Sequence, residues 1–213
     1  MIKNVIFDLG RVLIDWNPNG YLNKYVKDQE KIDAMFKEIF GSQEWQDLDR
    51  GTIKETEAIR RFKERCPNCH KEIDNLFENI IELIPPLEKN IGLFEEVASK
   101  YNTYILSNFG ERTFALVFEK YPWFKLFDGK IVSAHVKLLK PEKEIYEALI
   151  SKYSLNPDEC IFIDDTHANI IASEKIGIKG VHYTGEQELR EMLKKYIRSE
   201  ERRVGKECLR LCR

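Results

Sequence analysis

Four short segments of the sequence each place polar side chains directly after an apolar run. In chain order these residues are Asp8, Ser107 with Asn108, Lys140 with Pro141, and Asp164 with Asp165. Because the carboxyl ends of parallel strands share one edge of a sheet, these side chains can converge on one crevice. Three carboxylates that face one point repel each other unless a cation lies among them, and ligand sets made only of oxygen favour Mg²⁺. The pattern therefore predicts a Mg²⁺ site.

The same residue types suit the transfer of a phosphoryl group. A carboxylate beside Mg²⁺ can attack phosphorus and form an aspartyl-phosphate. The Ser107 hydroxyl and the Asn108 amide can donate hydrogen bonds to phosphoryl oxygens, and Lys140 can stabilise the charge of the transition state. Each residue also has a structural alternative, since such groups are common in turns and helix caps. The four segments together, in this order, favour a catalytic site.

The composition excludes several classes of protein. The formal net charge of −2 over 213 residues gives no electrostatic case for binding nucleic acid or an anionic membrane surface. No apolar run is long enough to span a bilayer, and Met-Ile-Lys leads into a predicted strand with no signal region, so we expect a cytoplasmic location. An odd number of cysteines, five, indicates reduced thiols, with Cys66 and Cys69 in a Pro-Asn loop between helices. Nothing in the sequence indicates an oligomeric state.

An alternation of strand-like and helical patterns predicts the fold class. The strand-like runs are 2–7, 103–106, 129–132, 160–163 and 180–183, and the helical runs are 89–100, 142–153 and 167–176. Alternation at this spacing predicts an α/β fold with a doubly wound parallel sheet and helices on both faces. We assign residues 1–15 and 86–198 to this core domain. Residues 199–213 do not continue the preceding apolar stripe, and we interpret them as a non-native tail.

Residues 16–85 have a helical pattern that interrupts this alternation. One predicted buried helix face contains Ile32, Met35, Phe36, Ile39 and Phe40. Thr52 with Glu55 three residues later has the pattern of a capping box and predicts a helix start. We therefore expect a helical-bundle cap domain inserted after the first strand.

The four segments together resemble the motifs of the haloacid dehalogenase-like (HAD) hydrolase superfamily. They read Phe-Asp-Leu-Gly-Arg-Val-Leu, Leu-Ser-Asn, Leu-Lys-Pro and Phe-Ile-Asp-Asp-Thr-His-Ala-Asn, and the resemblance covers residues 2–196. The helical insert is similar to the first cap type of the superfamily. Trp45 with Leu-Asp-Arg-Gly-Thr is similar to the branch that contains glucose-1-phosphate phosphatase-like enzymes.

The resemblance implies a Mg²⁺-dependent phosphatase that hydrolyses a small, sugar-like phosphomonoester through an aspartyl-phosphate. In that assignment Asp8 is the nucleophile and Lys140 the second catalytic residue. The implied metal ligands are Asp8, the main-chain carbonyl of Gly10, Asp164 and Asp165. The implied phosphoryl contacts are Ser107, Asn108 and Lys140. The cap would close over the substrate and exclude water.

Two residues near the cap are candidate substrate contacts on their chemistry alone. Arg50 could bind the substrate or support the Asp-Arg-Gly turn, and Trp16 could line the mouth of the site. Lys137 stands where many relatives have glycine, and it could add positive charge near the site or be solvated.

The sequence departs from the superfamily pattern at position 10. Most phosphatases of the superfamily carry a second Asp there, which protonates the leaving alcohol and later activates water. Gly10 has no side chain for this work, and losing a general acid typically costs about 10²–10⁴ in rate. The loss matters least for a good leaving group, such as an anomeric sugar phosphate. Asp15 could serve instead, or could be a surface residue.

Three other functions are compatible with part of this pattern. In a 2-haloacid dehalogenase Asp8 would attack carbon without a metal, but the Asp164-Asp165 pair would repel a carboxylate substrate. A non-catalytic sensor of a phosphorylated ligand would explain Gly10 but not the retained nucleophile. A phosphotransferase acting on a second alcohol would need a base for its acceptor, which Gly10 cannot supply.

Overall fold

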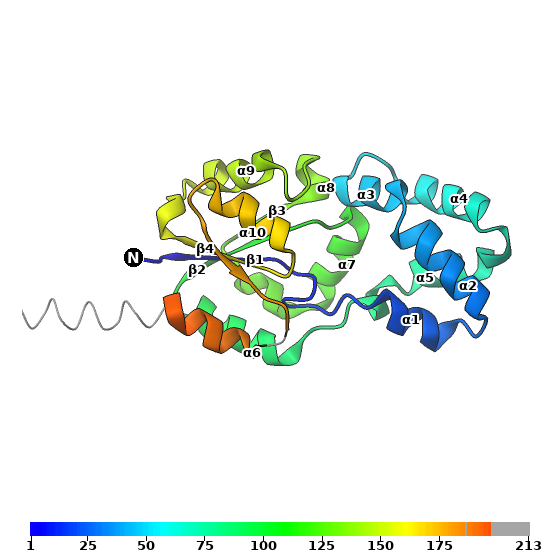
Figure 1. The fold of residues 1–213 in the computed structure, drawn as a ribbon, viewed down its shortest axis with the longest axis horizontal. Coiled ribbons are helices and arrows are strands. Elements are labelled where there is room, and N and C mark those ends of the chain that lie inside the picture. Colours follow the sequence, from blue (N-terminus) through cyan, green and yellow to red (C-terminus); the bar gives the residue numbers. More distant parts are fainter. Residues whose placement is uncertain (186, 197–213) are drawn as a thin grey trace, which may run out of the picture.

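The sheet consists of five parallel strands in the order β3-β2-β1-β4-β5. The strands are β1 (Asn4–Phe7), β2 (Asn102–Ser107), β3 (Gly129–Val132), β4 (Cys160–Asp164) and β5 (Lys179–His182). The computed structural model describes residues 1–185 and 187–196. Figure 1 shows the sheet in one lobe and a group of helices in a second lobe beside it. The predicted doubly wound α/β fold is confirmed.

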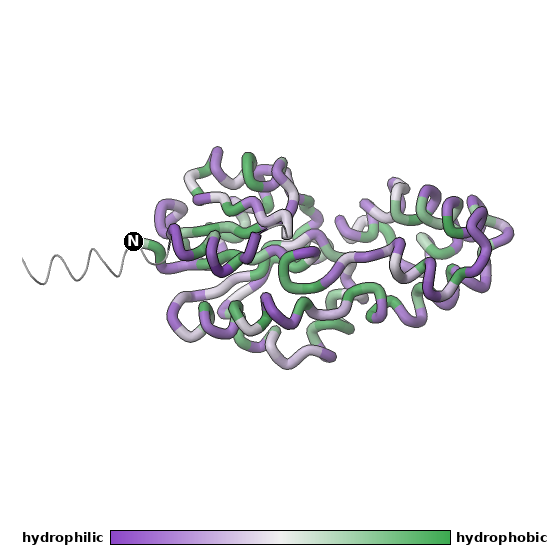
Figure 2. Tube along the Cα trace, turned by 60° about the horizontal axis from the view of Figure 1, so that its bottom comes forward, coloured by the Kyte–Doolittle hydropathy of each residue, from purple (hydrophilic) through white to green (hydrophobic). Residues whose placement is uncertain are grey.

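Alternate residues of the strands pack against helices on opposite faces of the sheet. The helices of this lobe include α6 (Glu88–Ala98), α7 (Glu111–Lys120), α8 (Ser133–Val136), α9 (Lys143–Tyr153) and α10 (His167–Glu174), and residues 189–196 are also helical. Val5 and Phe7 share a buried cluster with side chains of α6 and α7, whereas Ile6 belongs to the cluster of α9 and α10. Because both faces are covered, the central strands contain unbroken apolar runs, 5–7 in β1 and 160–163 in β4. Figure 2 shows the hydrophobic colour in these central strands.

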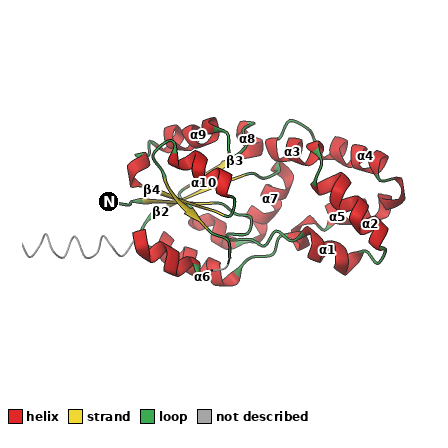
Figure 3. Ribbon diagram, viewed as in Figure 1, coloured by secondary structure: helices red, strands yellow, loops and turns green. Residues whose placement is uncertain are grey.

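The second lobe contains five short α-helices from the inserted segment, which Figure 3 shows grouped beside the sheet lobe. They are α1 (Pro18–Tyr25), α2 (Gln29–Met35), α3 (Gln43–Arg50), α4 (Glu55–Arg65) and α5 (His70–Glu78). A π-helical turn over Phe36–Phe40 follows α2 directly. Its wider spacing shifts the helix face, so Met35 and Ile39 are buried while Phe36 is 43% exposed. The prediction that Phe36 belongs to the buried face is therefore wrong.

The start of α4 also differs from the prediction. The helix begins at Glu55 with Lys54 as its N-cap, and no side chain caps it. Thr52 instead donates its backbone N–H (2.9 Å) and its hydroxyl (3.3 Å) to the carbonyl of Asp47. Gly51, in the left-handed region at φ 70°, makes this closure of α3 possible. The Thr52 side chain ends one helix rather than starting the next.

The chain enters and leaves the second lobe through two adjacent segments. Ile14 forms an antiparallel bridge with Pro86. Asp15 donates its backbone N–H to the carbonyl of Pro85 (2.7 Å), and Leu87 donates to the carbonyl of Leu13 (2.9 Å). The two crossings are thus hydrogen-bonded to each other at one point of the lobe boundary.

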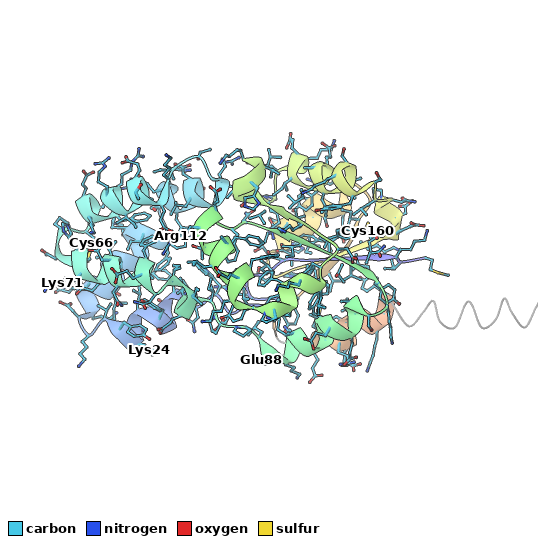
Figure 4. All side chains as sticks on the ribbon, turned by 180° about the vertical axis from the view of Figure 1, so that it is seen from behind. Lys24, Cys66, Lys71, Glu88, Arg112 and Cys160 are labelled. Carbon is cyan, nitrogen blue, oxygen red and sulfur yellow. A yellow bond between two sulfur atoms is a disulfide. The ribbon has the colours of Figure 1, made fainter. Side chains whose placement is uncertain are left out.

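A disulfide joins Cys66 to Cys69. A 3₁₀ turn over Pro67–Cys69 lies between α4 and α5, as expected, and it brings the two Cα atoms to 5.3 Å. The expectation of reduced thiols is wrong for this pair. Figure 4 labels Cys66 in the helical lobe, whereas the free thiol of Cys160 is buried at the start of β4.

Among the residues that the structure describes, no helix is long and apolar enough to cross a membrane. The interpretation of residues 199–213 as a non-native tail lies outside the described residues.

Candidate active site

The carboxyl edge of the sheet brings the four polar segments together. Strand β1 pairs with β2 on one side and β4 on the other, so Asp8, just after β1, lies between the ends of its two neighbours. Ser107 is the last residue of β2 and Asp164 the last of β4. Lys140 reaches the same point from the loop before α9.

Lys140 links two carboxylates at the centre of this edge. Its Nζ lies 2.7 Å from Asp8 Oδ1 and 2.6 Å from Asp164 Oδ2, and only 2% of its side chain is exposed. Ser107 Oγ donates a second hydrogen bond to Asp8 Oδ1 at 2.7 Å. Burial raises the pKa of Asp8 to about 6, although Lys140 opposes the shift, and the charge of Asp164 adds to it. Burial lowers the pKa of Lys140, but the charges of Asp8 and Asp164 raise it by more. The pKa of Lys140 is therefore above its usual value.

The hydrogen bonds of the two acids after β4 differ. The buried Asp164 accepts from Lys140, from the backbone N–H of Thr166 (2.8 Å) and from Asn169 Nδ2 (2.9 Å). The Asp165 side chain is 20% exposed, lies 3.6 Å from Arg11 and lines the cavity described below. Burial and the charge of Asp164 raise its pKa.

These carboxylates form a group that can hold a cation. One oxygen each from Asp8, Asp164 and Asp165 lie within 4.8 Å of one another, and no other such group of three occurs among the residues that the structure describes. Three carboxylates against the Lys140 ammonium and the Arg11 guanidinium leave a formal charge of −1. The backbone N–H groups of residues 11–14 donate hydrogen bonds to the carbonyls of Leu9 and Ile14. The Gly10 carbonyl accepts none of these hydrogen bonds. The residues present fit a hard divalent cation with oxygen ligands.

Two predicted substrate contacts have other partners. Asn108 donates its side-chain amide to the Lys140 carbonyl (3.0 Å) and accepts from the Lys140 backbone N–H (2.8 Å), so it holds the Lys140 loop in place. Arg50 forms a bidentate ion pair with Glu142, in the core lobe, and does not line the cavity. It connects the helical lobe to the sheet lobe.

A cavity of about 1080 Å³ lies between the carboxyl edge of the sheet and the helical lobe. Asp8, Lys140 and Asp165 are among its lining residues on the sheet side. Five aromatic residues of the helical lobe line the opposite side, and we call them the aromatic wall: Trp16, Phe36, Phe40, Trp45 and Phe77. Their rings contact one another, with Phe40 and Trp45 centroids 4.9 Å apart and Trp16 and Trp45 centroids 5.5 Å apart. The expectation that Trp16 faces the site agrees with its place in this wall.

Asp49 is a cavity residue that sequence analysis missed. It belongs to α3, and its half-buried carboxyl lines the cavity together with Asp8. The only signal in the sequence was its place in Leu-Asp-Arg-Gly-Thr, where the neighbouring Arg50 was the more obvious candidate. Asp15, considered as a replacement acid, is not a lining residue.

The chain matches a family profile, described as haloacid dehalogenase-like hydrolase, over residues 5–183. The chain belongs to the haloacid dehalogenase-like hydrolase family. The predicted superfamily is thus confirmed, while the glucose-1-phosphate phosphatase-like branch stays a prediction.

Two named phosphatases and one solved enzyme structure are similar to this chain. A sesquiterpene phosphatase of Aspergillus oryzae is 28% identical over 183 residues, which cover 85% of this chain and 90% of that protein. A D-ribitol-5-phosphate phosphatase of Bacteroides thetaiotaomicron is 24% identical and covers 84% of this chain and 90% of its own length. A HAD family enzyme from the same bacterium, solved in complex with magnesium and inorganic phosphate, superposes with a TM-score of 0.73 at 22% identity. That match covers 89% of this chain and 98% of the other, and it shows the shared fold.

Proposed function

We propose that this protein is a Mg²⁺-dependent phosphatase that hydrolyses a phosphomonoester through an aspartyl-phosphate on Asp8. The observation that carries the proposal is the group formed by Lys140 between Asp8 and Asp164, with Asp165 beside it at the cavity. The names of its relatives, phosphatases of small phosphorylated compounds, support the same reaction.

Each residue of the group has a separate role in this proposal. Ser107 and Lys140 hold Asp8 Oδ1, which orients the carboxylate for attack on phosphorus. Lys140 also stabilises the negative charge of the transferring phosphoryl group. Water then attacks phosphorus of the aspartyl-phosphate, which releases phosphate and restores Asp8. Asp164 positions Lys140, because its carboxylate is already taken up by Lys140, Thr166 and Asn169.

Asp8, Asp165 and the Gly10 carbonyl are the groups placed to bind Mg²⁺ directly. Asp165 lines the cavity, and its ion pair with Arg11 is longer than the hydrogen bonds that Asp164 accepts. We therefore assign Asp165 as the direct Mg²⁺ ligand and Asp164 as the residue that positions Lys140. Bound there, Mg²⁺ would neutralise the excess acid charge and polarise a phosphoryl oxygen. The structure of the magnesium-bound bacterial relative supports this choice of ion.

Phosphate release from a panel of phosphomonoesters tests the proposal. We expect turnover in the presence of Mg²⁺, a loss of at least about 100-fold in EDTA, and recovery when Mg²⁺ is added back. Tight binding of phosphorylated compounds without release would instead indicate a sensor. Chloride release from 2-chloropropionate without metal would indicate a dehalogenase.

Two substrate classes are candidates for this reaction. The sugar-like phosphomonoester expected from the sequence is supported by the relative that acts on D-ribitol 5-phosphate. The aromatic wall favours the second class, the phosphate of an apolar alcohol, because the alcohol would bury its apolar surface against the rings. The sesquiterpene phosphatase relative supports this class.

A comparison of two substrates separates these classes. If the aromatic wall binds the leaving group, a prenyl monophosphate should exceed a pentitol phosphate in kcat/KM by at least about tenfold, since it buries apolar surface. Trp45→Ala should then lower kcat/KM for the prenyl substrate by about tenfold and leave the pentitol phosphate little changed, while Trp45→Phe should keep most of the preference. A preference for the pentitol phosphate in the wild type would contradict the apolar class.

A further inference from the structure

The proposed reaction lacks a proton donor at the expected place. Gly10 lines the cavity but has no side chain, so nothing at this position can protonate the departing alcohol oxygen. A Cβ built on Gly10 would meet no atom within 4 Å, so the structure has space for a side chain there. The acid must therefore come from another part of the cavity wall, or the substrate must leave without one.

The side chain of Asp49 lines the cavity where the helical lobe meets the loop after β2. Helix α3 carries it to the lobe boundary, where its backbone carbonyl accepts a hydrogen bond from Ser133 Oγ. Ser133 Oγ in turn accepts from the backbone N–H of Phe109 at 2.8 Å. The Asp49 carboxylate accepts from the backbone N–H of Gly110, two residues after Asn108. These contacts fix Asp49 to the loop that follows β2, next to the phosphoryl-binding residues.

No cation among the described residues pairs with the Asp49 carboxyl. Arg50 is turned to Glu142, the Lys137 ammonium donates to the Gly51 carbonyl, and Lys140 lies between Asp8 and Asp164. Of the charged groups around it, Asp8 acts on Asp49 by repulsion. A carboxyl that is removed from water and has no cationic partner favours its protonated form. Burial accordingly raises the pKa of Asp49 to about 7, with the Gly110 N–H opposing the shift and the charge of Asp8 adding to it.

From this placement we infer that Asp49 is the general acid and base of the reaction, in place of the side chain that Gly10 lacks. The inference rests on the proposed function. As Asp8 Oδ attacks phosphorus, the bond from phosphorus to the alcohol oxygen breaks, and that oxygen takes the proton of Asp49. The Asp49 carboxylate then takes a proton from the water that attacks the aspartyl-phosphate. This returns Asp49 to its acid form and releases phosphate and free Asp8.

The structural alternative is that Asp49 only caps α7. Gly110 is the N-cap of this ten-residue helix and receives no side-chain bond from its own segment. A cap needs an acceptor oxygen, whereas a general acid needs a proton. Asp49→Asn keeps the oxygen that accepts from Gly110 but removes the exchangeable acid proton, so it separates the two roles.

The test compares two substrates with different leaving groups. For an n-alkyl phosphate, a poor leaving group, Asp49→Asn should lower kcat/KM by at least about 100-fold. For 4-nitrophenyl phosphate, which needs no protonation of its leaving group, the decrease should stay below about fivefold. The wild type should also lose activity on the alkyl phosphate above a pH of about 7, and this decrease should be absent in the variant.

A matched control and a rescue complete the design. Asp47→Asn makes the same chemical change on α3, at a residue that bonds Gln43 and does not line the cavity, and should leave both rates unchanged. Adding Gly10→Asp to Asp49→Asn should restore turnover of the alkyl phosphate. Equal losses on both substrates, no loss on either, or a double variant as slow as Asp49→Asn would each overturn the inference. A wild type that hydrolyses neither substrate would instead refute the phosphatase function itself.

Discussion

Replacing Asp8 with Asn is expected to reduce phosphate release by a factor on the order of 10⁴ or more, since it removes the proposed nucleophile of the proposed covalent step. The fold should be unaffected. The Asn amide oxygen can still accept from Ser107 Oγ, which now bonds Asp8 Oδ1 at 2.7 Å. The measurement is kcat with saturating Mg²⁺, together with the thermal unfolding temperature of both proteins.

The control for Asp8→Asn is Asp158→Asn, an exposed acid in the turn before β4, which should keep wild-type activity. A single turnover in ¹⁸O-water adds an independent readout. Water that attacks phosphorus places the label in phosphate, whereas attack on the carbonyl carbon would place it in the Asp8 carboxyl. Label in Asp8, or an active Asp8→Asn variant, would contradict the proposed mechanism.

Replacing Lys140 with Met should both abolish activity and destabilise the fold. The Lys140 ammonium lies 2.7 Å from Asp8 and 2.6 Å from Asp164. Without it, two buried carboxylates face each other, and removing one partner of a buried ion pair typically costs about 3–5 kcal/mol in the free energy of unfolding. Urea unfolding in EDTA measures this loss, and Lys143→Met, at an exposed lysine paired with Glu147, serves as the control.

The destabilisation of Lys140→Met should depend on pH. In the folded wild type the pKa of Asp8 is raised to about 6, and loss of the Lys140 ammonium raises it further. In the unfolded chain the pKa of an Asp carboxyl is about 3.9. At pH values between the unfolded and the folded pKa of Asp8, the folded variant binds more protons than the unfolded chain. The free energy of unfolding of the variant therefore falls as the pH rises. The difference in the free energy of unfolding between the variant and the wild type should therefore be smaller at about pH 5 than at about pH 8. A loss of stability that is the same at both pH values would contradict the proposed charge balance.

The sheet and the convergence of its polar ends could be predicted from the sequence. Buried parallel strands are apolar on both faces, so runs such as Cys160–Ile163 stand out from the helices between them. Because the side chains at the ends of such strands lie at one edge of the sheet, the sequence alone predicts that Asp8 and Asp164 lie close together. The bridging position of Lys140 follows from its loop and is visible only in the structure.

The cap could be predicted as helical but not in its details. The π-helical turn turns Phe36 and Phe40 towards the cavity, and a 3.6-residue pattern places them in the core instead. Arg50 and Asp49 are neighbours on α3, yet one reaches Glu142 and the other the cavity, because successive helix residues point about 100° apart. Which of them faces the substrate depends on how the cap rests on the core, and local sequence carries no signal for that.

The paired crossings at Ile14 and Pro86 give the cap a fixed pivot. Trp16 lies two residues from this pivot, so any rotation of the cap would displace it little. Helix α3 is held to the sheet lobe by the side chains of Ser133 and Glu142, and rotation would break these contacts and carry Asp49 away. The nucleophile and the proton donor would then be together only when the lobes are in contact. In the proposed mechanism, the protein would therefore hydrolyse only substrates that fit in the cavity while the two lobes stay in contact.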